Sequence, residues 1–226
     1  MKIAVILAGS GVYDGSEIHE SVLSLLAIEE LGHTANCFAP NKNQLHVINH
    51  LDGSVMEENR NVLIESARIA RGAITDLNSL DISNFDALLI PGGFGAAKNL
   101  NQWAVNGPDG SIDEEVKNTI LQFITTKKPI AALCMGPTVI AKALEGSGFH
   151  PTLTVGTSKE SSPYDIEGIA NGMEKIGTSH QEKTIREVAI DANLKIVSAP
   201  CYMMEASIVE LRDNIKMAVQ ALTKLN

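Results

Sequence analysis

The chain has 226 residues, 44% of them hydrophobic and 20% charged, and it carries a formal net charge of -9 at pH 7. This length suits one large domain with a full hydrophobic core. The acidic balance argues against a surface that binds nucleic acid or an anionic membrane, so we expect small molecules or proteins as partners.

The three cysteines are Cys37, Cys134 and Cys201, an odd number at wide spacing. They form neither a readable disulfide framework nor a zinc motif, and a reducing cytoplasm fits them best. The apolar start of the chain, residues 1–8, is too short to span a membrane and lacks a signal-type cleavage pattern. We therefore expect a cytoplasmic protein without a targeting or transmembrane segment.

The first predicted elements are a buried strand over residues 2–8, a glycine-bearing loop, and a helix over 17–31. A second strand is predicted over 34–39. This order is typical of the start of a doubly wound α/β fold. Gly9 and Gly11 do not continue into G-x-G-x-x-G, so a dinucleotide site is not predicted.

Three acidic residues stand at the start of the first helix. Asp14 and Glu17 have the spacing of a capping box, which explains Glu17. Glu20 lies on a second face of the helix, just past the end of a strand, where a carboxyl group is a candidate for a raised pKa and for proton transfer. A solvated surface glutamate is the alternative. The main apolar stripe of this helix consists of Ile18, Val22, Leu25 and Leu26.

Residues 41–59 form the least regular stretch, which mixes polar and apolar residues and is expected to pack over the body of the protein. His46 and His50 are four residues apart and could share a helical face as metal ligands, but no third ligand accompanies them. We interpret both as loop residues, with His50 close to the site. A helix is predicted over 60–71.

A buried strand over residues 85–90 runs into the glycine-rich stretch 91–99. Such glycines let the backbone approach a ligand closely, with N–H groups directed at an oxyanion, although a tight turn uses glycines too. Lys98 is not followed by Ser or Thr, so a phosphate-binding loop is not predicted.

The segment Ile130–Leu133 is an apolar strand that leads directly into Cys134. Gly136 and Pro137 end it, and Pro137 suits the first turn of a helix over 138–144. A cysteine at such a corner lies near free N–H groups and the positive end of a helix dipole, which favours the thiolate. This arrangement is typical of a nucleophile elbow, although a small buried core cysteine fits the same residues.

The remaining elements complete an α/β pattern without repeats or linkers, so residues 1–226 are interpreted as one domain. A helix capped by Ser111 and Glu114 is predicted to end near residue 125. The later elements are a strand over 152–155, a helix over 164–175, a hairpin of 184–190 with 195–198, and a last helix capped by Ser207 and Glu210.

Four stretches of the sequence closely resemble the ElbB-type proteins of the ThiJ/PfpI superfamily, flavodoxin-like relatives of class I glutamine amidotransferases. They are residues 11–20, 60–72, 91–99 and 195–203. The resemblance covers nearly the whole chain. It implies a flavodoxin-like, mostly parallel sheet with helices on both faces, a nucleophile elbow after a central strand, and a homodimer.

The resemblance also implies site residues. Cys134 would be the nucleophile, with Glu20 rather than Glu17 beside the sulfur, and the backbone amides of Gly93 and Met135 would form the oxyanion hole. We expect Glu17, Gly92 and His50 as neighbours of this site. Similar proteins are described as glyoxalases that convert glyoxal or a similar 2-oxoaldehyde to a hydroxy acid without glutathione or another cofactor, and they have been linked by name to isoprenoid biosynthesis.

One departure from the superfamily bears on activity. Many members carry histidine directly after the cysteine, where this chain has Met135, and no histidine-glutamate pair of the glutaminase type is recognisable near the C-terminus. Nothing in the sequence indicates that His180 lies near Cys134. Two hypotheses follow: a weak, cofactor-independent glyoxalase with an aldehyde substrate, or a non-catalytic, redox-responsive protein in which Glu20 stabilises an oxidised Cys134. No metal is expected at the site.

Overall fold

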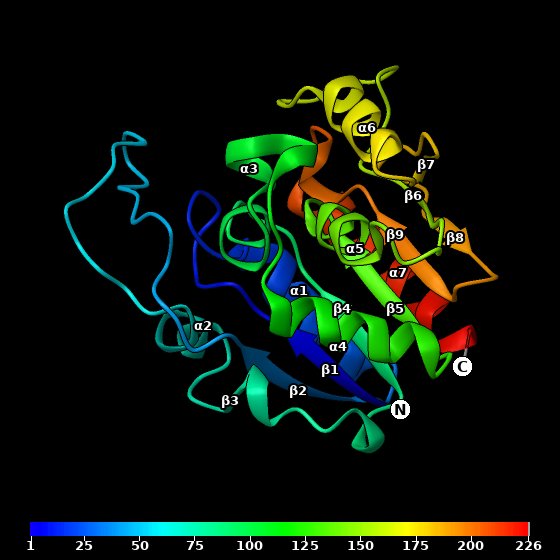
Figure 1. The fold of residues 1–226 in the computed structure, drawn as a ribbon, viewed down its shortest axis with the longest axis horizontal. Coiled ribbons are helices and arrows are strands. Elements are labelled where there is room, and N and C mark those ends of the chain that lie inside the picture. The colour runs from blue at the N-terminus through cyan, green and yellow to red at the C-terminus, as the bar shows by residue number, and fades with distance from the viewer. Residues whose placement is uncertain (226) are drawn as a thin grey trace.

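A seven-stranded sheet forms the centre of the molecule, in the order β3-β2-β1-β4-β5-β9-β8 (Figure 1). The computed structural model describes residues 1–225. From β3 to β9 in this order the strands are parallel, whereas β8 at the edge is antiparallel to β9. The strands are β1 Lys2–Ile6, β2 Thr34–Ala39, β3 Ile74–Asp76, β4 Ala87–Ile90, β5 Ile130–Leu133, β8 Ala189–Asp191 and β9 Ile196–Ala199.

Helices cover both faces of this sheet. α1 packs beside α7 on one face, and α4 packs beside α5 on the other (Figure 1). The predicted α/β, flavodoxin-like class is therefore confirmed, including the C-terminal hairpin of β8 and β9. The helices are α1 Ile18–Glu30, α2 Val62–Ile69, α3 Trp103–Asn106, α4 Glu114–Thr125, α5 Gly136–Leu144, α6 Ile166–Lys175 and α7 Ile208–Lys224.

The central strands are buried on both faces. Every residue of β4, β5 and β9 is buried, which explains their unbroken apolar sequences, because a parallel strand between two helical layers has no polar face. A second, two-stranded parallel sheet of β6 (Thr152–Leu153) and β7 (Ser179–His180) lies outside the main sheet. The strand predicted over 184–190 is shorter in the structure, where β8 spans only Ala189–Asp191.

The outer face of α1 differs from the prediction. Ile18, Val22 and Leu26, which periodicity assigned to the core, are 43–47% exposed. The buried face instead includes two serines, Ser21 and Ser24. Their hydroxyls donate hydrogen bonds to backbone carbonyls one turn earlier, at 2.7 and 2.6 Å, and so need no water. A hydrophobicity pattern counts these serines as polar, and the stripe was therefore placed on the wrong face.

Two predicted helix caps are also wrong. The N-cap of α4 is Asp113, whose carboxylate accepts hydrogen bonds from the amides of Glu115 and Val116, and Ser111 lies outside the cap. In α1 the N-cap is Glu17 itself, which accepts from the amide of Glu20 at 2.7 Å. Asp14 instead accepts from the amide of Ile48. The capping box at the start of α7 is confirmed.

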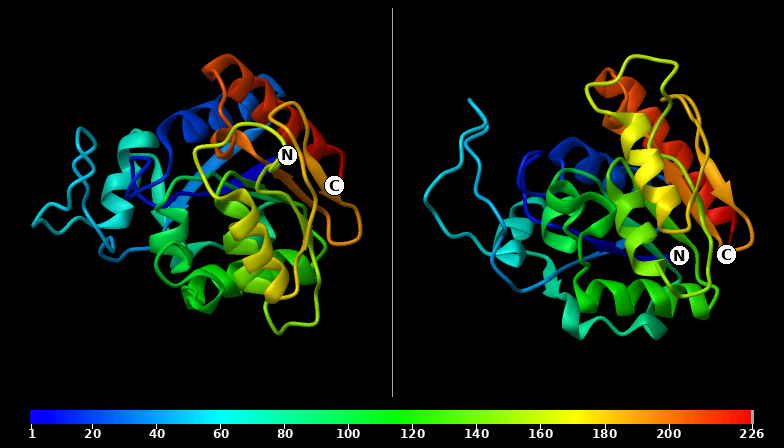
Figure 2. Two further views of the ribbon diagram at one scale, coloured as in Figure 1. Left: turned by 90° about the horizontal axis from the view of Figure 1, so that it is seen from above. Right: turned by 45° about the horizontal axis from the view of Figure 1, so that its top comes forward.

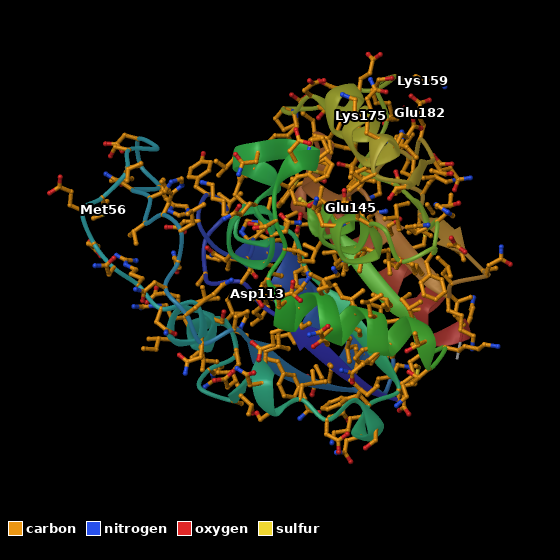
Figure 3. All side chains as sticks on the ribbon, viewed as in Figure 1. Met56, Asp113, Glu145, Lys159, Lys175 and Glu182 are labelled. Carbon is orange, nitrogen blue, oxygen red and sulfur yellow. The ribbon has the colours of Figure 1, made fainter. Side chains whose placement is uncertain are left out.

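Residues 43–61 form an arm that projects from the body in both views of Figure 2. Antiparallel bridges join Asn43 to Asn61 and Ile48 to Val55, so the arm is an irregular hairpin. Its outer part is exposed, with Leu51 at 96%, and Figure 3 shows Met56 at its far end. The expectation that this stretch packs over the body holds for its base and for Val47, which is buried, but not for its tip.

Candidate active site

The candidate site lies at the carboxyl ends of β1, β4 and β5. The chain leaves β1 toward β2 on one side and β4 toward β5 on the other, so adjacent β1 and β4 form the switch point of the sheet. Ligands of open α/β sheets bind in the crevice at such a point. The loops that follow these three strands carry the glycine-bearing turn after β1, the Pro91-Gly92-Gly93 turn and Cys134.

Cys134 occupies the sharp corner between β5 and α5. Its φ of +55° lies in the left-handed region, where a side chain other than glycine is strained. Its N–H donates to the carbonyl of Ala199 on β9 at 2.9 Å, which fixes the corner to the neighbouring strand. The geometry is that of a nucleophile elbow. Cys134 is, however, only 4% exposed, so its sulfur is more enclosed than we expected.

Glu20 reaches this corner from the first turn of α1 and is completely buried. Its carboxyl group accepts hydrogen bonds from the amides of Gly92, at 2.9 Å, and of Tyr202, at 3.3 Å. Burial, reinforced by the nearby Glu17 carboxylate, raises the pKa of Glu20 to about 8. The prediction of a raised pKa at Glu20 agrees with this geometry, and the surface alternative is wrong.

The Glu20 carboxyl group and the Cys134 thiol interact through a side-chain hydrogen bond, and Gly92 lies against both of them. A Cβ at position 92 would collide with the Cβ of Cys134 and would lie 2.6 Å from Glu20 Oε2 and 2.7 Å from Cys134 Sγ. Only glycine therefore lets the carboxyl group and the sulfur stand together here. The carbonyl of Gly92 also accepts from the amide of Glu17 at 3.0 Å, which fastens the start of α1 to this turn.

The thiolate expected from the elbow is not favoured in the free protein. Burial raises the pKa of the Cys134 thiol well above its ordinary value, and the Glu20 carboxyl raises it further. Hydrogen bonds from the amides of Gly93 and Met135 act in the opposite direction but do not prevail. The helix N-terminus stabilises an anion, yet desolvation of a fully enclosed sulfur outweighs it. Both predicted oxyanion-hole amides thus point at the sulfur.

Two predicted neighbours of the site, Glu17 and His50, differ in how close they lie to the pair of Glu20 and Cys134. Glu17 is buried beside the pair, and burial raises its pKa. His50 belongs to the arm and contacts the loop after β1: its ring lies 5.0 Å from that of Tyr13, and its Nε2 accepts from the Tyr13 amide. His180 accepts from the amide of Val155 at 3.4 Å. Neither histidine is hydrogen-bonded to Cys134 within the described residues.

Two aromatic rings stand over the turn after β4. Phe94 and Tyr164 pack edge to face with ring centres 5.8 Å apart. Burial, with the charges at Cys134 and Glu20, raises the pKa of Tyr164 to about 12. Tyr164 lines three cavities, of about 610 Å³ beside Phe94, about 470 Å³ beside Glu17 and Tyr202, and about 260 Å³ beside Ser162 and Asp165.

Asn99 joins three loops around the site. It lies on η3 (Ala96–Leu100), a single turn of π-helix, and is buried. Its amide nitrogen donates to the carbonyls of Ala8 and Asp14, at 2.8 and 2.9 Å, and its oxygen accepts from the amide of Leu45 at 2.9 Å. The loop after β1, the turn after β4 and the base of the arm are thus held by one side chain.

This corner, with a carboxyl group beside the sulfur, occurs in a chain whose residues 12–199 match the sequence profile of the DJ-1/PfpI family. The chain belongs to the DJ-1/PfpI family. It is 40% identical over 226 residues to the rat protein named ES1 protein homolog, mitochondrial, covering 99% of this chain and 84% of that one. Identity is also 40% to the human glutamine amidotransferase-like class 1 domain-containing protein 3, mitochondrial, with coverage of 99% and 83%.

Solved structures of other family members share the fold. A protein from Ehrlichia chaffeensis, described as an isoprenoid biosynthesis protein with an amidotransferase-like domain, superposes with a TM-score of 0.90 and 34% identity, covering 100% of this chain and 99% of that one. DJ-1beta of Drosophila melanogaster superposes with a TM-score of 0.54 at 15% identity, covering 99% and 94%. At that identity the likeness shows the fold alone.

Sequence reasoning missed Tyr202 and Tyr164 in this family member. The Tyr202 amide holds Glu20, and a signal for it existed: residues 200–203 follow a strand, and the carboxyl ends of parallel strands share one edge. Tyr164 was assigned to a helix, whereas α6 begins at Ile166 behind the N-cap Asp165. No local pattern marks the residue before such a cap as part of a site.

The structure adds two findings on metal ions and membranes. Within residues 1–225, no group of three His, Cys, Asp or Glu side chains is arranged to hold a metal ion. None of the helices in the same range combines the length and the apolar character that a membrane crossing demands.

Proposed function

We propose that this protein is a cofactor-independent glyoxalase, which converts glyoxal or a similar 2-oxoaldehyde to a 2-hydroxy acid. The observation that carries the proposal is the pair of Glu20 and Cys134 across Gly92, with the amides of Gly93 and Met135 at the sulfur. The family includes glyoxalases and proteases, which supports an enzyme of this kind. The pair offers a nucleophile and a proton carrier within contact of each other.

In the first step, the Cys134 sulfur forms a bond to the aldehyde carbon, and the thiol proton passes to the carbonyl oxygen. The developing oxyanion is stabilised by the two backbone amides until that proton arrives. The product is a hemithioacetal. Because burial raises the pKa of the Cys134 thiol, little thiolate is present at neutral pH, and we expect slow turnover.

Glu20 carries the proton in the second step. With a pKa of about 8, it exists in both forms near neutral pH, as an acid-base catalyst requires. Its carboxylate removes the hydrogen from the former aldehyde carbon, and the resulting acid returns the proton to the neighbouring carbon through an enediol. The thioester so formed is hydrolysed by water, which releases the hydroxy acid and the thiol. No external electron acceptor takes part.

Glyoxal turnover by purified variants tests the proposal. Cys134→Ala should abolish glycolate production, whereas Cys37→Ala, a matched buried cysteine on β2, should retain it. If Cys134→Ala kept full turnover, the mechanism would be wrong.

A redox-responsive role is the second candidate. It is supported by donors already directed at the Cys134 sulfur, because an acid proton on Glu20 and the two amides can stabilise the oxygens of a sulfinate. Peroxide treatment followed by peptide mass analysis distinguishes the roles. Selective gain of oxygen at Cys134, in protein that turns over no aldehyde, supports the redox role.

Further parts of the proposal concern family branch, location and assembly. The match to the Ehrlichia protein supports an ElbB-type member and one domain over residues 1–226. The three free cysteines suit a cytoplasmic location, which we also propose, although curated relatives are named mitochondrial. We also propose a homodimer. The exposed ridge of Ile18, Val22 and Leu26 on α1 supports it, because an unpartnered apolar helix face is typical of an interface. Val22→Asp should shift the size-exclusion peak to the monomer.

A further inference from the structure

A cavity of about 610 Å³ lies between the arm and the body of the protein. Its volume falls within the range of sites for small organic ligands. Ile48 and Gly53 of the arm form one wall, and Tyr13, Phe94 and Tyr164 form the aromatic part of the other. Glyoxal has no substituent that could occupy such a space.

The cavity adjoins the catalytic corner through two of its wall residues. Phe94 directly follows Gly93, whose amide points at the Cys134 sulfur. Tyr164 packs edge to face on Phe94 and is close enough to Cys134 and Glu20 for their charges to raise its pKa. A carbonyl carbon held at the sulfur would therefore direct its substituent along these rings.

Lys98 brings a positive charge to this aromatic cavity. Its Nζ donates a hydrogen bond to the Tyr13 carbonyl at 2.8 Å and lies 5.5 Å from the centre of the Phe94 ring. An ammonium group has three donors, so two remain for a ligand. Lys98 forms no ion pair with a carboxylate of residues 1–225, although the chain as a whole is acidic. Partial burial lowers the pKa of Lys98, and the attraction of the Asp14 carboxylate acts in the opposite direction without prevailing.

We infer that this cavity binds the substituent of the substrate, and that the substrate class is 2-oxoaldehydes with an aromatic or bulky apolar body that ends in a carboxylate. The apolar body lies against Tyr13, Phe94 and Tyr164, and the carboxylate pairs with Lys98. This inference rests on the proposed function, because it concerns the substrate of the same Cys134 site. A single ammonium matches the single charge of a carboxylate.

Turnover of two arylglyoxals tests the substrate class. For wild-type protein, kcat/KM for 4-carboxyphenylglyoxal should exceed that for phenylglyoxal by about tenfold or more, as expected for a charge-assisted hydrogen bond. Lys98→Met should remove this preference and Lys98→Arg should keep most of it, since arginine retains the charge. Lys117→Met, on α4, is the matched control and should keep the wild-type ratio.

Equilibrium binding separates this inference from the proposed function. Mandelate and 4-carboxymandelate, the products of the two arylglyoxals, are titrated calorimetrically into the Cys134→Ser variant. The inference expects 4-carboxymandelate to bind about tenfold more tightly or better, and K98M in the same background to abolish the difference. If this binding preference is found but the wild-type protein turns over no aldehyde, the proposed glyoxalase function is refuted and the inference about the cavity stands. Equal affinity for the two acids, or a preference unchanged by K98M, would overturn the inference.

Discussion

Replacement of Glu20 by glutamine should change how the stability of the protein depends on pH. Glu20 has an ordinary pKa of 4.5 when exposed and a pKa of about 8 in the folded protein. Because the folded value is the higher one, the protonated acid stabilises the fold. This contribution is complete below pH 4.5 and is lost as pH rises to 8. Each pH unit between the two values costs about 1.4 kcal/mol, so the full loss is about 5 kcal/mol.

Glutamine does not ionise, so Glu20→Gln lacks this pH-dependent loss. Its NH₂ group cannot accept a hydrogen bond, and one of the amides of Gly92 and Tyr202 loses its acceptor, at a cost of about 1–3 kcal/mol at every pH. The two stability curves should therefore cross: wild type is the more stable protein at pH 5, and the variant is the more stable one at pH 8.

Urea unfolding at pH 5, 6, 7 and 8 measures both curves. The difference between the two proteins reports Glu20 and the groups coupled to it, because titrating groups that do not interact with Glu20 cancel. Glu210→Gln is a control at an exposed carboxylate whose pKa is lowered by its hydrogen bonds with Ser207, and it should leave the slope between pH 5 and 8 unchanged. Parallel curves for wild type and Glu20→Gln would refute the assignment of a neutral, buried acid at this position.

Three further predictions concern the space beside Gly92, the reactivity of Cys134 and the N-cap of α4. Gly92→Ala should lower the free energy of unfolding by about 1–3 kcal/mol in urea titrations and abolish aldehyde turnover, because the added methyl group has no space between Glu20 and Cys134; unimpaired turnover would contradict the contact. Iodoacetamide should alkylate Cys134 slowly at pH 7 and faster above pH 9, and Glu20→Gln should speed the reaction at pH 8 because a neighbouring negative charge is gone, as peptide mass mapping can establish. Asp113→Ala should lower the free energy of unfolding by about 1–2 kcal/mol, because two amides of α4 lose their cap. Ser111→Ala should change it by no more than about 0.5 kcal/mol in thermal unfolding. The reverse order of the two effects would show that Ser111 is the N-cap, as the sequence pattern indicated.

The parallel core was predictable because its strands are unbroken apolar segments bounded by turn residues. A run such as Ile130–Leu133 has no polar face, and strand, turn and helix follow each other in a regular order. The meeting of Glu20 and Cys134 was expected from the resemblance to ElbB-type proteins, and it agrees with the rule that the carboxyl ends of parallel strands share one edge. That rule fixes which segments meet without knowledge of any side-chain contact.

The ionisation of the site was not predictable in the same way. The pKa of Cys134 depends on what encloses the sulfur, and residues near it, such as Tyr164, come from distant segments with no pattern of their own. The orientation of α1 was missed because Ser21 and Ser24 satisfy their hydroxyls within the helix and can be buried. Both failures concern desolvation, which arises from tertiary packing rather than from local sequence.

The hydrogen bonds of Asn99 have a consequence for how the substrate range of this protein can change. Both N–H groups of this amide are occupied by carbonyls of the loop after β1, and its oxygen is occupied by the amide of Leu45 at the base of the arm, so the turn after β4, which carries Asn99, is joined to both. A lengthened or shortened loop on any one of these parts would displace the other two. New specificities should therefore arise by exchange of side chains on a fixed rim, or by growth at the free end of the arm, where no such bond restrains the chain.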